Sequence, residues 1–317
     1  MTGRLSQWLR PVAAVAGVVA VAAVLVLVNG HDGSDRSLSP RIPPTCQTNQ
    51  ADSAGERNAL ASRALKRQDA ALRLGSQAGY LATWDSRAQG ARWHAEHIYA
   101  NLRALRITEL DPRYDGAGSG LSLVAQQRLG TDAWKAEVDV SYALAASDPR
   151  RAETTVSFTF VRRGEVALVV AIEPAESKRT PIWLLPRLNV ARSARTLVAA
   201  TTAAEARRVG RHLRQAVEDV EKVLPSWAGK LVAYVPGNSV QLEALLAASP
   251  GSYDGIAAVT TTVDGSERQD APVVIVVNPA VLDDLGPIGS HVVVTHESTH
   301  VATNAAVVKM PLWVAEG

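Results

Sequence analysis

Three residues near the carboxyl end of the chain could together hold a metal ion and activate a water molecule. His296, Glu297 and His300 form an H-E-x-x-H pattern. On a helix the two histidines lie one turn apart, so both imidazoles leave the same face and can bind one ion. Glu297 lies about 100° further round, where it can reach a water on that ion without binding the ion itself. The pattern indicates hydrolysis by zinc-activated water, with Glu297 as the general base.

A catalytic zinc site needs a third protein ligand and keeps its fourth position for water. After His300 the chain contains no further His, Cys or Asp, and its one Glu is Glu316. The metzincin spacing would require Gly at position 303 and His at position 306. This chain has Thr303 and Ala306 there, so the metzincin pattern is excluded.

The segment that contains Glu316 reads P-L-W-V-A-E-G over Pro311–Gly317. It resembles the W-x-x-E-G phrase of the gluzincin metallopeptidases, in which a glutamate on a second helix completes the zinc site. The wider stretch from about Leu231 to Gly317 is similar to the peptidase MA-like branch of these enzymes, which is found in membrane-attached proteins of actinobacteria. Besides the two motifs, its hallmarks here include the strand expected at Val273–Pro279.

The resemblance implies a role for each of these residues. His296, His300 and Glu316 would bind Zn²⁺, and Glu297 would be the catalytic base in the hydrolysis of a peptide or protein substrate. In the resembled family the ligand glutamate begins a longer helix that further helices follow, whereas here only Gly317 follows Glu316. We therefore expect a metallopeptidase domain that is incomplete at its C-terminus. The alternative is a non-catalytic extracytoplasmic binding or scaffold protein with a degenerate peptidase-like domain.

The N-terminal 50 residues predict attachment to a membrane. The segment Pro11–Val28 contains no charged residue and is long enough to span a bilayer as a helix. Arg4 and Arg10 precede it and favour an N-terminus on the cytoplasmic side. We therefore predict a cytoplasmic tail at 1–10, a transmembrane signal anchor at 11–28, a linker at 29–50 and extracytoplasmic domains beyond it. A cleaved signal peptide is the alternative.

The composition is that of an ordinary globular chain. The net charge is +2 and 47% of the residues are hydrophobic, so no basic patch suggests nucleic acid as a partner. Cys46 is the single cysteine, which excludes an intrachain disulfide. The sequence leaves the oligomeric state open.

Residues 51–180 predict helices followed by strands. The apolar spacing between Ala51 and Ala82 indicates one long helix or two shorter ones, and Trp93–Arg103 indicates another. Apolar alternation and turn signals then predict strands at Ser122–Arg128, Trp134–Ala143, Thr154–Val161 and Glu165–Ile172. This order resembles the cone-shaped fold of the nuclear transport factor relatives, in which helices pack on a curved antiparallel sheet.

Two histidines in this part of the chain are three residues apart. His94 and His97 could in principle share a metal, but among their neighbours only Glu96 could add a ligand. Histidines on an exposed helix face are much commoner, and that is the interpretation we favour.

Residues 181–317 predict the N-terminal half of a zincin-like metallopeptidase domain, which makes the whole chain α+β. An irregular junction is expected at Pro174–Arg195, with Trp183 as a packing residue. The expected elements that follow are a helix at Ala203–Val223, a strand at Leu231–Val235, a helix at Val240–Leu246, strands at Ile256–Val263 and Val273–Val277, and a helix at about Pro287–Ala306.

The last of these helices carries the metal motif. Val292, Val293 and Val307 are expected to face the core, and His291 is turned about 140° from His296, away from the metal. In gluzincins an extended peptide can add to the edge of the sheet beside this helix. Either Val273–Val277 or Ile256–Thr262 could be that edge.

Overall fold

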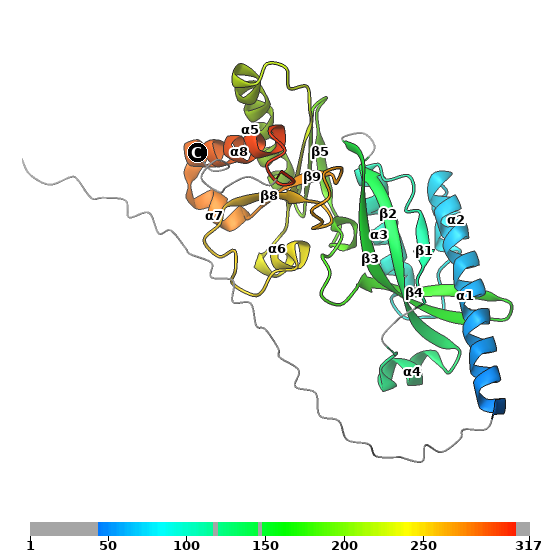
Figure 1. The fold of residues 1–317 in the computed structure, drawn as a ribbon. Coiled ribbons are helices and arrows are strands. Elements are labelled where there is room, and N and C mark those ends of the chain that lie inside the picture. The colour runs from blue at the N-terminus through cyan, green and yellow to red at the C-terminus, as the bar shows by residue number, and fades with distance from the viewer. Residues whose placement is uncertain (1–43, 117–119, 145–147, 309–317) are drawn as a thin grey trace, which may run out of the picture. The chain divides into compact units, whose positions relative to one another are not determined.

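A computed structural model of the chain describes residues 44–116, 120–144 and 148–308 (Figure 1). From Gln47 onward the described chain belongs to one compact unit. It contains helices and two sheets, which confirms the predicted α+β class. No helix within the described ranges is long and apolar enough to cross a membrane. The tail predicted at 1–10 and the anchor predicted at 11–28 lie outside those ranges.

The first sheet is a four-stranded antiparallel meander in the order β1-β2-β3-β4. Its strands are β1 (Pro112–Tyr114), β2 (Ala133–Leu144), β3 (Asp148–Arg163) and β4 (Val166–Pro174). The even-numbered residues of β2 from Trp134 to Tyr142 are buried against the helices. A shift of register between Thr159 and Phe160 leaves Val170 of β4 as the extra residue of a β-bulge. The three long strands confirm the predicted ones, whereas β1 was not predicted.

Three helices bury their apolar residues against this sheet: α1 (Pro44–Arg73), α2 (Gln77–Leu81) and α3 (Ala91–Leu105). The segment that predicted one long helix or two shorter ones forms two. Gly75 ends α1 with a φ of +66°, and the Ser76 hydroxyl caps α2 by accepting a hydrogen bond from Gly79 N at 3.0 Å.

Two predictions in this half need correction. Of the linker predicted at 29–50, only 44–50 lie within the described residues, and they are helical, because proline suits the first turn of a helix, where its missing N–H would have no partner. The strand predicted at Ser122–Arg128 is the helix α4 (Leu123–Leu129). The Ser122 hydroxyl caps this helix by accepting a hydrogen bond from Ala125 N at 3.2 Å. Leu123 and Val124, whose apolar side chains suggested a strand, are exposed to solvent.

The second sheet has five strands in the order β5-β6-β7-β9-β8. They are β5 (Asn189–Arg192), β6 (Thr196–Ala200), β7 (Leu231–Val235), β8 (Ala258–Thr262) and β9 (Val273–Val277). The three inner strands are parallel, and the outer strands β5 and β8 run antiparallel to their neighbours. The continuous apolar runs L-V-A-Y-V and V-V-I-V-V are explained by burial of these inner strands on both faces.

The two faces of the second sheet belong to different cores. Even-numbered residues of β7 and β9 are buried with the helices of the first sheet and with α6 (Ser239–Leu246), whereas odd-numbered ones are buried with α5 (Ala203–Val223) and α8 (Gly286–Ala302). A short helix, α7 (Pro279–Asp284), precedes α8. The two predicted domains, 51–180 and 181–317, therefore contain one sheet each and share a buried core.

The junction at Pro174–Arg195 is more regular than predicted. It contains a short 3₁₀ helix at Ile182–Leu184 and the edge strand β5, and β6 follows directly. Trp183 is fully buried, which confirms its predicted packing role. Both strands were missed because each is short and is flanked by polar residues.

Asn101 ties this junction to α3. Its side chain is 1% exposed. Nδ2 donates to Trp183 O at 3.2 Å and to Leu185 O at 2.9 Å, and Oδ1 accepts from Leu188 N at 2.9 Å. One buried side-chain amide thus provides hydrogen-bond partners for three backbone groups of the junction.

Replacing Asn101 with alanine should therefore destabilise the protein strongly. We expect Asn101→Ala to lower the free energy of unfolding by about 3 kcal/mol, because it leaves buried backbone groups unpaired. The measurement is urea unfolding, with a lower midpoint at an unchanged slope. Gln127→Ala on the exposed side of α4 is the control and should change the midpoint little. Equal midpoints for the two variants would contradict this role of Asn101.

Candidate metal centre

The helix α8 carries the H-E-x-x-H residues and packs against α5, β8 and β9. Its most buried positions are taken by small side chains, namely Ser290, Val294 and Ser298. Ser298 Oγ donates to Val294 O at 2.6 Å, and Ser290 Oγ donates to Leu282 O at 2.7 Å, so both buried hydroxyls are satisfied. These short side chains let α8 approach the sheet closely.

The burial of α8 differs from the prediction at one position. Val292 was expected to face the core but is 60% exposed, and Val294 is fully buried instead. The three consecutive valines 292–294 make this ambiguous in sequence, because each would suit the core. The rotation that buries Val294 also turns His296 toward solvent.

His296 and His300 lie one turn apart, as predicted, with their side chains converging. Their Nε2 atoms are 2.9 Å apart, and the ring planes are nearly perpendicular, with centroids 4.4 Å apart. The potential ligand atoms of His296, Glu297 and His300 all lie within 4.8 Å of one another. Two imidazole nitrogens this close together can bind one divalent ion, zinc among several, and the carboxyl group of Glu297 lies beside them. The residues therefore fit the implied metal.

Glu316, the third ligand implied by the resemblance, lies outside the described residues. Its predicted role is not tested by the structure.

Glu297 is the buried member of the group, with 8% of its surface exposed. The hydroxyl of Thr260 on β8 donates to Glu297 Oε2 at 2.7 Å, and the same hydroxyl lies 3.0 Å from Glu297 O. A buried carboxyl group needs such a donor, because desolvation without a partner is costly. Thr260 thus fixes one oxygen of Glu297 and leaves Oε1 for another partner.

Thr260 lies on the edge strand of the second sheet. The order of strands places β8 outermost and β9 between β7 and β8. Of the two strands that the sequence left open, Ile256–Thr262 therefore contains the edge beside α8, and Val273–Val277 is an inner strand.

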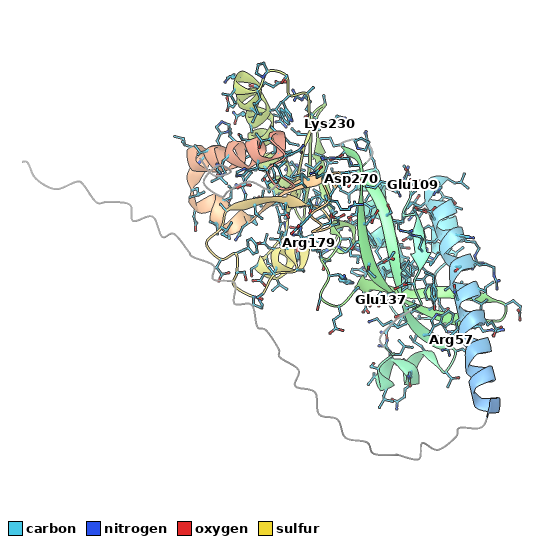
Figure 2. The ribbon with its side chains drawn as sticks, in the orientation of Figure 1. Arg57, Glu109, Glu137, Arg179, Lys230 and Asp270 are labelled. Atoms are coloured by element: carbon cyan, nitrogen blue, oxygen red, sulfur yellow. The ribbon has the colours of Figure 1, made fainter. Side chains whose placement is uncertain are left out.

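The ladder between β8 and β9 determines which backbone groups of β8 are open. Val263 N donates to Pro272 O, and Asn278 N donates to Ala257 O, both at 2.8 Å, so the odd-numbered residues of this segment face β9. Because the direction alternates along an antiparallel strand, the N–H and C=O groups of Ala258 and Thr260 face the open edge. Thr262 O faces the same way but accepts a hydrogen bond from Nη1 of Arg179 (Figure 2) at 2.7 Å.

His291 faces α5 and points away from the pair His296 and His300, in agreement with its predicted position on the helix. Its Nε2 lies 2.9 Å from Asp219 Oδ2 on α5. Hydrogen bonds from Lys222 and from His291 lower the pKa of Asp219. The ring of His212 on α5 stacks on that of His291, with centroids 6.2 Å apart. The pKa of His212 is lowered mainly by burial and secondly by the charge of His291. This cluster of half-buried side chains links α5 to α8.

His94 and His97 do not join a metal-binding group within the described residues. The His97 ring packs on Trp93 with centroids 3.9 Å apart, and its Nδ1 lies 2.9 Å from Trp93 O. This geometry agrees with the interpretation as histidines on a helix surface.

The sequence reasoning missed Thr260 and Asp219. Thr260 belongs to a run of three threonines in a strand, and nothing in that run distinguishes the one that faces Glu297. Asp219 is one of several acidic residues on the polar side of α5, so its pairing with His291 becomes visible only when the two helices are packed.

No protein-family model, curated protein or solved structure matches this chain, so the gluzincin and cone-fold resemblances remain predictions.

The Thr260 hydroxyl should be needed for stability at this site. We expect Thr260→Val, which keeps the shape of the side chain, to lower the free energy of unfolding by about 2 kcal/mol, because a buried carboxyl group loses its donor. Thr260→Ser keeps the hydroxyl and should retain most of that stability. Urea unfolding of the three proteins measures the difference. Equal loss in both variants would show that the methyl group matters and the hydroxyl does not.

Proposed function

We propose that this chain is a gluzincin-type zinc metallopeptidase, anchored in the cell membrane by its N-terminal segment with the folded part on the extracytoplasmic side. The observation that supports it best is the arrangement on α8. Two imidazole nitrogens converge beside a buried carboxyl group, and the donor of that carboxyl group lies on an open strand edge.

His296 and His300 would hold the ion through their Nε2 atoms, and Glu316 would be the third ligand, as the resemblance implies. Zinc at this site would act as a Lewis acid toward the scissile carbonyl group and would lower the pKa of water.

Glu297 would move the proton. Its Oε2 is held by the Thr260 hydroxyl at 2.7 Å, so Oε1 is the oxygen left to accept a proton from the attacking water. The same carboxyl group would then deliver that proton to the leaving amide nitrogen. Because Glu297 is buried and fixed, it needs little reorganisation to do so.

The open edge of β8 supports an extended peptide as the substrate. The backbone groups of Ala258 and Thr260 could pair with a peptide as an added antiparallel or parallel strand. Arg179 occupies the Thr262 carbonyl, so pairing would stop at that end of the strand. The backbone of Thr260 would then pair with the substrate, while the side chain of Thr260 holds Glu297.

Metal content is the first test of this proposal. We expect about one zinc per purified full-length chain, and we expect His300→Ala and Glu316→Ala to reduce it strongly, because each removes a ligand. Metal analysis by mass spectrometry measures this directly. His94→Ala is a matched control, since it removes an exposed histidine of α3 and should leave the zinc content unchanged.

Different outcomes separate the parts of the proposal. Zinc that survives Glu316→Ala would exclude Glu316 as the third ligand while leaving the histidine pair in place. A parent protein without zinc, even after zinc is supplied, would contradict the metallopeptidase and favour the binding or scaffold protein.

The role of Glu297 is tested by Glu297→Gln. We expect this variant to retain zinc and to lose at least about 100-fold in peptide hydrolysis, because the amide cannot accept the proton from water. A library of random decapeptides, with cleavage followed by mass spectrometry, supplies substrates without a prior choice of sequence. Cleavage by Glu297→Gln at the parent rate would refute the assigned role.

A further inference from the structure

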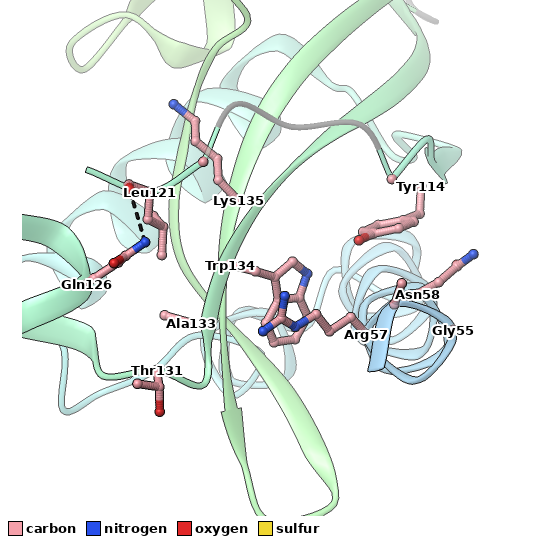
Figure 3. A pocket seen from close by; sticks show the side chains of 13 residues that line it. Gly55, Arg57, Asn58, Tyr114, Leu121, Gln126, Thr131, Ala133, Trp134 and Lys135 are labelled. Atoms are coloured by element: carbon pink, nitrogen blue, oxygen red, sulfur yellow. Dashed lines mark hydrogen bonds between the residues drawn. The ribbon is translucent and has the colours of Figure 1, made fainter. Parts of the chain in front are cut away.

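A cavity of about 690 Å³ lies where the beginning of β2 meets α1, far along the chain from the metal centre (Figure 3). Cavities of roughly 300–1,000 Å³ are the usual size for small-molecule ligands. Among the described residues, its wall includes Arg57 and Asn58 of α1, Tyr114 of β1, and Trp134 and Lys135 of β2.

Trp134 and Tyr114 are the aromatic residues in the wall of this cavity, and buried rings lie behind them. Trp134 stacks on Phe160 with centroids 5.4 Å apart, and Phe160 stacks on Phe158 at 5.5 Å. Tyr114 packs against the same Phe160 ring at 6.4 Å. Trp134 is 7% exposed, so the rings are held rigidly by the core beneath them. A rigid aromatic wall favours a flat apolar ligand, which can stack without loss of side-chain entropy.

The charge at the cavity is positive. Figure 3 shows the Arg57 side chain over the Trp134 ring, and the guanidinium carbon is 5.8 Å from the ring centroid. Arg57 makes no ion pair within the described part of the chain, and no Asp or Glu is among the described residues that line the cavity. Lys135 is the other charged lining residue, and its side chain points away from Arg57. Its Nζ lies 3.4 Å from Glu173 Oε2.

The other polar groups beside Arg57 are hydrogen-bond donors. Asn58 Oδ1 already accepts from Ser62 Oγ at 3.1 Å, which leaves the Asn58 amide N–H₂ as a donor. Burial raises the pKa of Tyr114, against the opposing effects of the Trp134 indole N–H and the Arg57 charge, so its hydroxyl keeps its proton at neutral pH. The indole Nε1 of Trp134 is buried near the Tyr114 hydroxyl but makes no hydrogen bond of normal geometry in the described structure.

We propose that this cavity binds a small organic carboxylate with a flat, apolar body. The planar guanidinium of Arg57 would take the carboxylate in a paired, two-bond geometry, with Asn58 and Tyr114 as additional donors. The body of the ligand would lie against the aromatic wall. A single unpaired guanidinium matches one carboxylate better than a multiply charged phosphate ester. This site is independent of the proposed peptidase activity.

Equilibrium dialysis of 2-naphthoate against the full-length chain tests the proposal, with 2-naphthamide as the neutral ligand of the same shape. We expect one saturable site per chain for the carboxylate and at least tenfold weaker binding of the amide. Arg57→Gln should weaken naphthoate binding at least tenfold and remove the preference for the carboxylate. Arg63→Gln, an exposed arginine on the same helix that does not line this cavity, should bind like the parent.

A second variant locates the ligand without removing the cation. Thr131 is exposed and lines the cavity, so Thr131→Trp places a bulky side chain in it with little effect on the core, and it should weaken the binding of both naphthoate and naphthamide. Unchanged binding in Thr131→Trp would overturn the location. Equal affinity for the acid and the amide in the parent, or full affinity in Arg57→Gln, would overturn the carboxylate assignment.

Discussion

The candidate metal centre depends on the hydrogen bond between the Thr260 hydroxyl and the Glu297 carboxyl group. The rotation of α8 about its axis decides where His296 and His300 point, and the apolar residues of this helix do not define that rotation, since several of its sides are apolar. Thr260 binds the one buried carboxyl group of the helix at 2.7 Å, and Asp219 binds His291 on another side at 2.9 Å. These two polar contacts are directional, so they select one rotation where apolar packing alone would allow others.

The platform under α8 gains its rigidity from burial on both faces. Alternate residues of β6, β7 and β9 pack into two different cores, one with α5 and α8 and one with α6 and the helices of the first sheet. A displacement of the second sheet would therefore disturb both cores at once. Asn101 adds a directional link between α3 and the junction that leads into β5, because it satisfies three backbone groups there. The first sheet thus supports, through packing, the half that contains the candidate metal centre.

Sequence reasoning located the parts of this fold whose signal is local. The H-E-x-x-H residues lie on one helix because their spacing is that of a helical turn, and the long strands β2, β3 and β4 have clear alternation and turn signals. It failed where a local signal was ambiguous. Ser122 with the residues after it could begin a helix or a strand, and Pro44 could mark an extended linker or the first turn of a helix. Three adjacent valines gave no means of choosing Val294 over Val292. Thr260, Arg57 and Trp134 were missed because their roles arise from contacts between segments far apart in the chain.

The register of β8 links substrate and base in the proposed function. On an edge strand, the residues whose backbone groups face outward alternate with those that face the neighbouring strand. In β8 the residues whose backbone groups face outward include Thr260, and the side chain of Thr260 also points at Glu297. A shift of one residue would place Val259 or Thr261 beside Glu297 and would turn the opposite set of backbone groups outward. The residue that would pair with a peptide is therefore the residue that positions the general base, so alignment of the substrate and placement of the carboxyl group are set by the same pairing of β8 with β9.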